Sequence, residues 1–192
     1  MNPIILITSC IHHLRKNDDC RNTWLAQWGG KIAYKFVLGR DAVQQYDDEI
    51  VLPVDDTYYG LPEKIRESHC WALKQGYDYI LKTDADMWIH VPRLLASGYE
   101  KYPYSGNFHW GSFALGGSYW LNREASEVLS RSGLPRYGTD GGDDVWVGKV
   151  LAENYIPGHH DPRYVVGKIT EDFISYHTTG NLSMAEVHSQ CV

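Results

Sequence analysis

Hydrophobic residues in the first half of the chain fall in short continuous runs that end at glycine or acidic residues. Residues 4–7 read Ile-Ile-Leu-Ile, and an unbroken apolar run is typical of a strand covered on both faces. Later runs have similar lengths and endings, so each predicts another strand. We expect strands at residues 3–9, 31–38, 49–54, 77–82, 118–121 and 173–177.

Between these strands, apolar positions recur with the spacing of a helix. Residues 61–75 carry such a stripe, and Gly76 follows as a natural end. The alternation of strands and helices predicts an α/β fold with a Rossmann-type nucleotide-binding sheet. We expect further helices at residues 18–28, 122–133 and 143–151, the first capped by Asp18 or Asp19 and the second by Asn122.

Composition narrows the class of protein. The chain has 192 residues, which suits a single domain over residues 1–192. Its seven tryptophans and fourteen tyrosines fill a core or bind the faces of sugar and base rings. A formal net charge of −6, without a long basic run, disfavours a protein that holds nucleic acid mainly through its phosphates.

The four cysteines, Cys10, Cys20, Cys70 and Cys191, lack the paired spacing of a zinc site. We interpret them as free thiols, with a disulfide between the first two as the alternative. The apolar run at residues 4–7 is too short for a signal peptide, and no later run approaches the length of a membrane span. We therefore expect a soluble, cytoplasmic protein without a membrane partner or an obligate protein partner.

Two carboxylates follow the strand predicted at residues 77–82. Asp84 and Asp86 flank Ala85, and in extended chain such a pair points to one side. Ligands of α/β sheets bind beyond the carboxyl ends of the strands. A divalent cation would remove the repulsion between the two acids and bind a diphosphate as well. Solvated loop acids are the alternative.

A metal at this turn needs a further ligand. His177, at the end of the last predicted strand, is our candidate, and an imidazole would shift preference from Mg²⁺ toward Mn²⁺. A surface histidine without a ligand role is the other interpretation. The rival candidates are the pairs His12-His13 and His159-His160.

A second acidic pair, Asp143 and Asp144, follows a glycine-rich loop at residues 137–142 and opens a predicted helix. Carboxylates at this position commonly stabilise the helix N-terminus. One of the two could instead act as a general base, with the loop closing over substrates.

Six segments in order resemble the β-1,3-glycosyltransferase family that includes Fringe and the β-1,3-galactosyltransferases. Each segment is common by itself, but together they extend over most of residues 4–177. The segments are Arg21-Asn22-Thr23-Trp24, Asp55-Asp56-Thr57-Tyr58-Tyr59 with Leu61 and Lys64, Tyr79 to Asp86, Tyr102-Pro103, Gly116 to Leu121, and Asp143 to Gly148.

The resemblance implies a GT-A-like architecture, in which a donor-nucleotide and metal half (residues 1–90) is fused to a smaller acceptor half (residues 91–192). It also implies a UDP-sugar donor, Mn²⁺ or Mg²⁺, and inversion at the anomeric carbon. By position in the motifs, the metal ligands would be Asp84, Asp86 and His177, the general base Asp144 or, second, Asp143, and the donor-binding residues Arg21, Asp56, Lys64, Asp84, Gly116 and Gly117.

Two positions depart from the family pattern. Ala85 stands where a third acid is usual, and Asp143 replaces a glutamate. The chain is also shorter than animal members and lacks their membrane anchor. We therefore expect a microbial or viral enzyme.

The function predicted on these grounds is a metal-dependent inverting hexosyltransferase that moves a sugar from a UDP-sugar to an acceptor hydroxyl. The expected acceptor is a glycan or small glycoside, with a hydroxymethylated DNA base as the alternative, and Trp110, Trp120 and Trp146 are candidates to line its pocket. Two other classes remain open: a metal-dependent phosphoesterase, which would need no acceptor, and a non-catalytic sugar- or nucleotide-binding module.

Overall fold

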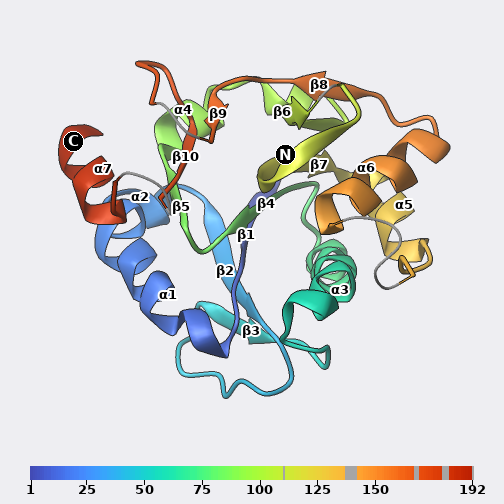
Figure 1. Ribbon diagram of the computed structural model, residues 1–192, viewed down its shortest axis with the longest axis horizontal. Coiled ribbons are helices and arrows are strands. Elements are labelled where there is room, and N and C mark those ends of the chain that lie inside the picture. The colour runs from blue at the N-terminus through green and yellow to red at the C-terminus, as the bar shows by residue number, and fades with distance from the viewer. Residues whose placement is uncertain (110, 137–141, 167–168, 179–181, 192) are drawn as a thin grey trace.

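A seven-stranded mixed sheet forms the centre of the computed structural model, in the order β3-β2-β1-β4-β7-β6-β8 (Figure 1). A second sheet of three short strands has the order β5-β10-β9. The structure describes residues 1–109, 111–136, 142–166, 169–178 and 182–191. The strands are β1 (Pro3–Thr8), β2 (Ala33–Leu38), β3 (Glu49–Val51), β4 (Tyr79–Asp84), β5 (Met87–Ile89), β6 (Tyr104–His109), β7 (Phe113–Asn122), β8 (Gly158–His160), β9 (Tyr164–Val165) and β10 (Ser175–His177).

The first half of the chain builds the parallel part of the large sheet. Strands β3, β2, β1 and β4 pair in parallel, so the carboxyl ends of β1 and β4 lie at the same edge. Strand β7 then pairs antiparallel with both β4 and β6. The predicted α/β fold with a Rossmann-type sheet is confirmed, and the sheet continues into the second half of the chain.

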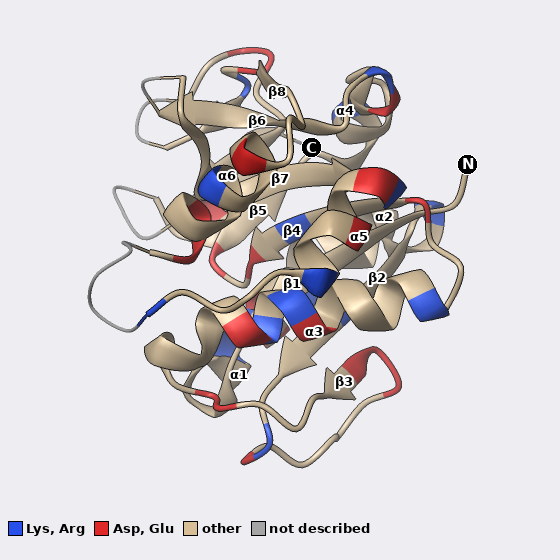
Figure 2. Ribbon diagram, turned by 90° about the vertical axis from the view of Figure 1, so that its right-hand side faces the viewer, with Lys and Arg blue, Asp and Glu red and all other residues tan. Residues whose placement is uncertain are grey.

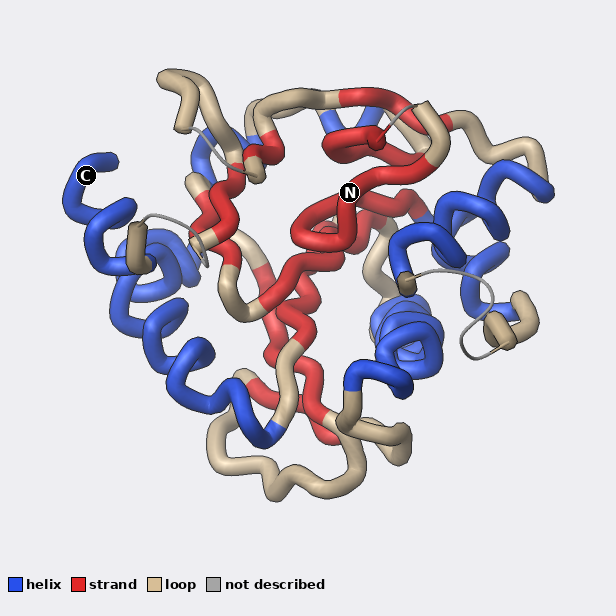
Figure 3. The backbone as a smooth tube through the Cα atoms, viewed as in Figure 1, coloured by secondary structure: helices blue, strands red, loops and turns tan. Residues whose placement is uncertain are grey.

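Helices cover both faces of the large sheet (Figures 1 and 3). Helices α1, α2 and α7 lie on one side of it, and α3, α5 and α6 lie on the other. The helices are α1 (Leu14–Cys20), α2 (Ala26–Trp28), α3 (Leu61–Lys74), α4 (Val91–Leu95), α5 (Arg123–Arg131), α6 (Asp143–Glu153) and α7 (Met184–Cys191), with 3-10 turns η1 (Ile11–His13), η3 (Gly29–Lys31), η4 (Tyr58–Gly60) and η5 (Tyr99–Lys101) and a π turn η2 (Arg21–Leu25).

The continuous apolar run of β1 is buried on both faces of the sheet, as the sequence predicted. Successive side chains of a strand point to opposite faces. Ile5 and Ile7 therefore join the core on one side of the sheet, and Ile4 and Leu6 join the core on the other. All four side chains are at most 1% exposed, because helices cover both faces.

The first helical region differs from its prediction. Helix α1 begins at Leu14 without a side-chain cap, so the predicted caps Asp18 and Asp19 are wrong. The helix then passes into the π turn η2, where Thr23 has non-helical angles of φ −117° and ψ −107°. In contrast, Asn122 caps α5 as predicted, since its side chain accepts a hydrogen bond from the backbone N–H of Ala125.

Strand β7 is ten residues long and extends well beyond the predicted strand at 118–121. Gly116 and Gly117 interrupt its apolar pattern, which hides the longer strand in the sequence.

The four cysteines are free thiols. Within the part of the chain that the structure describes, none of the helices combines the length and the apolar character that a membrane crossing requires.

Candidate active site

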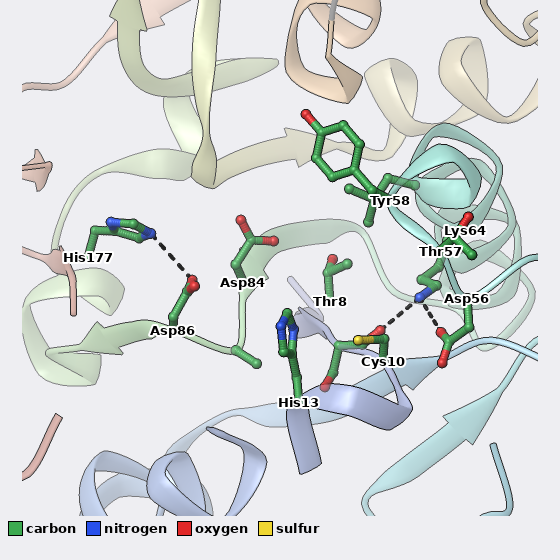
Figure 4. Close-up of a pocket in the computed structure, with 13 residues that line it drawn as sticks. Thr8, Cys10, His13, Asp56, Thr57, Tyr58, Lys64, Asp84, Asp86 and His177 are labelled. Atoms are coloured by element: carbon green, nitrogen blue, oxygen red, sulfur yellow. Dashed lines mark hydrogen bonds and ion pairs between the residues drawn. The ribbon is translucent and has the colours of Figure 1, made fainter. Parts of the chain in front are cut away.

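A cavity of about 260 Å³ opens where strands β1 and β4 end (Figure 4). This is the edge of the sheet at which α/β proteins bind their ligands. Figure 4 shows Asp84 pointing into the space between Tyr58 on one side and Asp86 with His177 on the other. The cavity is lined by Thr8, Ser9, Cys10, His13, Asp56, Thr57, Tyr58, Leu61, Lys64, Asp84, Ala85, Asp86 and His177.

Asp84, the last residue of β4, is the acid at the centre of the cavity. Its side chain remains 35% exposed because it opens into the cavity. The surrounding protein nevertheless raises the pKa of Asp84 to about 6 through burial, although the nearby Lys82 opposes the rise. A carboxylate that costs energy to charge gains most from an added cation.

Asp86 lies two residues further on and already has cationic neighbours. Its Oδ2 is 3.0 Å from the Lys16 ammonium, and its Oδ1 is 3.6 Å from Nε2 of His177. Burial acts to raise the pKa of Asp86, but the contacts with His177 and Lys16 outweigh it and hold the pKa well below its usual range. The same contact with Asp86 raises the pKa of His177. The two predicted ligands thus meet in space although 91 positions separate them in the sequence.

Lys82 is a buried cation behind the cavity. Its side chain is 3% exposed, and its Nζ lies 2.8 Å from the Asp84 carboxylate and 3.7 Å from that of Asp143. It also donates a hydrogen bond to the carbonyl oxygen of Gly116. Burial acts to lower the pKa of Lys82, but the two acids outweigh it and raise the pKa, so the side chain stays charged. One ammonium therefore joins the acidic turn to the start of α6.

The second acidic pair opens helix α6, as predicted, and its two members face different partners. Asp144 accepts hydrogen bonds from the backbone N–H of Gly116 at 3.2 Å and of Val145 at 2.8 Å. Asp143 directs its Oδ2 toward Lys82, and this buried oxygen has no hydrogen-bond partner. Asp143 therefore balances the charge of Lys82, whereas Asp144 is fixed beside the glycine pair of β7.

Asp56 and Lys64 form a buried ion pair with an N–O distance of 2.5 Å at the opposite end of the cavity. The Asp56 carboxylate also accepts backbone hydrogen bonds from Gly39 at 2.7 Å and Ile11 at 2.8 Å. Lys64 donates a second bond, to the carbonyl oxygen of Ser9 at 2.7 Å. The pair fixes the segments that follow β1 and β2 to helix α3, and it forms the wall of the cavity.

Two of the expected donor-binding residues lie elsewhere. Arg21 forms ion pairs with Asp48 at 2.7 Å and Glu49 at 2.8 Å, and it lines neither of the two large cavities of the described residues. Gly117 packs against Met87, whose sulfur would lie 3.0 Å from an added Cβ. Gly116 does lie beside a site residue, because an added Cβ there would approach Asp144 to 3.5 Å.

The rival histidines are separated by the fold. His13 lines the cavity, and burial, followed by Lys16, lowers its pKa. His159 stacks on Tyr102 with ring centroids 3.6 Å apart, and His160 accepts a hydrogen bond from the backbone of Phe108. This arrangement leaves His177 and His13 as the histidines of the cavity among these candidates.

Trp120 and Trp146, two of the three tryptophan candidates, do not line either large cavity of the described residues. Trp120 is 1% exposed and stacks on Tyr99 with ring centroids 4.1 Å apart. Trp146 is 3% exposed and donates to the carbonyl oxygen of Gly133. Both are core residues, so their predicted role is wrong. Trp110 and most of the predicted closing loop, residues 137–141, lie outside the described residues.

The chemistry of these side chains fits a divalent cation only in part. Asp84, Asp86 and His177 supply carboxylate and imidazole donors, the set preferred by Mn²⁺ over Mg²⁺. Among the described residues, however, no group of three or more His, Cys, Asp or Glu side chains is arranged to hold a metal. A cation here would need phosphate oxygens and water to complete its coordination.

Sequence reasoning missed Lys16, Lys82 and Tyr58 as site residues. Lys82 had a signal, since it is a charged residue inside an otherwise apolar strand and such a residue needs a buried partner. Tyr58 was part of a matched segment but had no assigned role. Lys16 offered no signal, because only the tertiary structure brings α1 to the acidic turn.

Known proteins share both sequence and fold with this chain. Residues 15–107 match the family model described as Galactosyltransferase. A human protein, UDP-GalNAc:beta-1,3-N-acetylgalactosaminyltransferase 2, is 32% identical over 71 residues, which is 36% of this chain and 14% of that protein. Its Xenopus laevis counterpart is 30% identical over 71 residues, with 36% and 15% covered. The chain thus matches about a seventh of the length of these relatives.

The fold extends the comparison beyond the matched segment. A crystal structure of a glycosyltransferase involved in the glycosylation of the major capsid of PBCV-1 superposes with a TM-score of 0.61 at 14% identity, covering 100% of this chain and 98% of that chain. That likeness concerns the fold, which is the GT-A-like fold expected from the sequence. The matched segment is just under half of the chain, and together with the shared fold it supports a resemblance to the β-1,3-glycosyltransferase family.

Proposed function

We propose that this protein is a metal-dependent inverting glycosyltransferase that moves a sugar from a UDP-sugar to an acceptor hydroxyl. The observation that carries the proposal is the cavity at the ends of β1 and β4, where Asp84, Asp86 and His177 meet. The match of residues 15–107 to the Galactosyltransferase family model supports the reaction class. The cavity is bounded on its far side by the Asp56–Lys64 pair, so a nucleotide would bind between this pair and the acidic turn.

The proposed metal ligands are Asp84, Asp86 and His177, and the ion is Mn²⁺ or Mg²⁺. When bound, such an ion neutralises the charge that builds on a departing diphosphate. Asp86 would exchange its contact with the Lys16 ammonium for this ion. The displaced ammonium would then be available to the phosphate oxygens of the donor.

The proposed chemical step is a single displacement. The acceptor oxygen forms a bond to the anomeric carbon while the bond from that carbon to the phosphate oxygen breaks, and the electron pair leaves with UDP. Asp144 takes the proton of the acceptor hydroxyl. We assign the base to Asp144 rather than Asp143, because the Oδ2 of Asp143 is buried toward Lys82, whereas Asp144 is held by two backbone N–H groups.

The test is UDP release from a panel of UDP-sugars with Mn²⁺ and then with a chelator. We expect one donor to be turned over only with metal, and Asp86→Ala to abolish this turnover. Asp19→Ala, which changes an exposed acid of α1, is the matched control and should leave it intact. A chain that hydrolyses simple phosphate esters without any acceptor would instead be a phosphoesterase. A chain that binds donor but tolerates loss of Asp144 would be a binding module.

A further inference from the structure

Gly116 lies in a stretch of β7 that has no regular pairing with its neighbouring strands. Pairing between β7 and β4 ends at Ser118. On the other side, β6 pairs with Tyr119 and then with Ala114, and the register shifts between these two positions. Irregularities of this kind often lie next to active sites, where they end the pairing of a strand. The backbone groups of Gly116 therefore lie outside the regular ladder of the sheet.

Side chains from two other elements bind both backbone groups of Gly116. Lys82 of β4 donates a hydrogen bond to its carbonyl oxygen, and its own N–H donates to Oδ2 of Asp144 at 3.2 Å. Glycine has no side chain that could fix its backbone by packing, and it adopts more backbone conformations than other residues. These two bonds therefore hold Gly116 where the strand pairing does not.

Lys82 is itself held in a fixed direction. It is the basic residue of β4, a strand otherwise uncharged up to the acid at its end (Figure 2). Its Nζ lies 2.8 Å from the Asp84 carboxylate and 3.7 Å from that of Asp143. A buried ammonium stays with its partners because a charge without them is costly. A continuous chain of contacts thus runs from Asp84 through Lys82 and Gly116 to Asp144.

The last contact of this chain bears on the proposed base. Oδ1 of Asp144 accepts a hydrogen bond from the N–H of Val145 at 2.8 Å, which belongs to the same helix. The bond from Gly116 to Oδ2 instead ties the carboxylate to the sheet. A movement of Gly116 would therefore turn the carboxylate relative to the cavity at the strand ends.

We propose that Lys82 is a positioning residue for the proposed base: by holding the Gly116 carbonyl, it places the N–H group that orients the Asp144 carboxylate. This inference rests on the proposed function, in which Asp144 is the base. A cation bound at Asp84 would share the carboxylate that Lys82 now binds and would repel its ammonium. The ammonium would shift toward the Gly116 carbonyl, so metal binding and the orientation of Asp144 are coupled.

A purely structural role for Lys82 makes a different prediction. If the ammonium only balances the charges of Asp84 and Asp143, its removal lowers stability and leaves the bond between Gly116 and Asp144 intact. A positioning role requires this bond to change when Lys82 is replaced. The backbone amide NMR signal of Gly116 separates the two roles, because an amide proton moves upfield when its hydrogen bond weakens.

The test first compares backbone amide NMR spectra of the unaltered chain and three variants without metal. Asp144→Ala removes the acceptor and defines the upfield shift of the Gly116 amide proton when the bond is lost. Lys82→Met should shift this proton in the same direction. Lys149→Met, which removes an exposed lysine of α6, should leave it unchanged. The amide of Asn122, at the far end of β7, should not move in any of the proteins.

A second measurement uses the unaltered chain, so it decides the proposal even if Lys82→Met fails to fold. Mg²⁺ is added together with UDP, because Mn²⁺ is paramagnetic and broadens NMR signals. The amide signals of Asp84 and Asp86 should shift, and that of Gly116 should shift with them at the same metal concentrations.

The proposal is overturned if Lys82→Met leaves the Gly116 amide where it is in the unaltered chain. It is also overturned if Mg²⁺ with UDP shifts the amides of Asp84 and Asp86 and not that of Gly116. Failure of Mg²⁺ and UDP to shift any of these signals would count against the proposed function alone, since the comparison without metal still decides the role of Lys82.

Discussion

The Lys82 ammonium lies 2.8 Å from the carboxylate of Asp84, and its side chain is 3% exposed. The same ammonium is 3.7 Å from Asp143, so one buried cation connects the end of β4 to the start of α6. Lys82 therefore links Asp84, one of the acids proposed for metal binding, to the helix that carries the proposed base.

Replacing Lys82 by methionine should destabilise the fold by about 3 kcal/mol, because it leaves two acids without their cation. The value lies at the low end of the range since Asp84 is open to the cavity. Urea unfolding would measure it. The double variant Lys82→Met with Asp143→Asn should recover part of the lost stability, because it no longer carries one of the two unpaired negative charges. Strictly additive effects of the two changes would show that the two side chains do not interact.

The two acids of α6 should respond differently to neutralisation. Asp144→Asn should lower kcat by about 10²–10⁴-fold, the usual contribution of a general base, with donor affinity unchanged. Asp143→Asn should affect stability more than kcat, since its carboxylate faces Lys82. Steady-state kinetics with donor binding measured separately would check both. Equal kcat losses in the two variants would contradict the assignment of Asp144.

Gly39 should tolerate no side chain, because its place is next to the Asp56–Lys64 pair. A Cβ there would lie 2.7 Å from both Cβ and Oδ1 of Asp56. Gly39→Ala should therefore destabilise the fold by about 1–3 kcal/mol and weaken UDP binding. The matched control is Gly30→Ala, where an added Cβ meets no atom within 4 Å. Similar unfolding midpoints for the two variants would rule out this close approach.

The buried His69 of α3 should make stability depend on pH. Burial, followed by the charge of Lys82, lowers the pKa of His69 to about 3, well below the ordinary value near 6.5 of an unfolded chain. Between these two pKa values, the His69 imidazole is protonated in the unfolded chain and neutral in the folded chain. The contribution of His69 to the free energy of unfolding is therefore fully present above about pH 6.5 and is lost as the pH falls toward 3.

Lowering the pH from 7 to 5 should therefore reduce the free energy of unfolding by about 2 kcal/mol through His69. Urea unfolding at both pH values would measure the loss. His69→Asn keeps a group for the hydrogen bond that Nδ1 makes with Ser126 at 3.0 Å but cannot take up a proton. An equally large loss in this variant would assign the pH dependence to other groups.

The sequence alone was sufficient for the class of fold and for the position of the acidic turn at the end of a strand. The apolar run of β1 predicts a doubly covered strand because its alternate residues must be buried on opposite faces. Asp84 and Asp86 follow a buried strand, and strand ends are where α/β sheets bind ligands. Both inferences use local spacing, which the chain carries without reference to distant residues.

Only the tertiary structure decided which side chains share the site. His177 meets Asp86, and Lys16 meets the same carboxylate from α1, because strand pairing and helix packing bring together segments far apart in the chain. Arg21 matched a family motif, yet its guanidinium is bound by Asp48 and Glu49. Contacts of this kind depend on the distances between elements, and local spacing does not determine those distances.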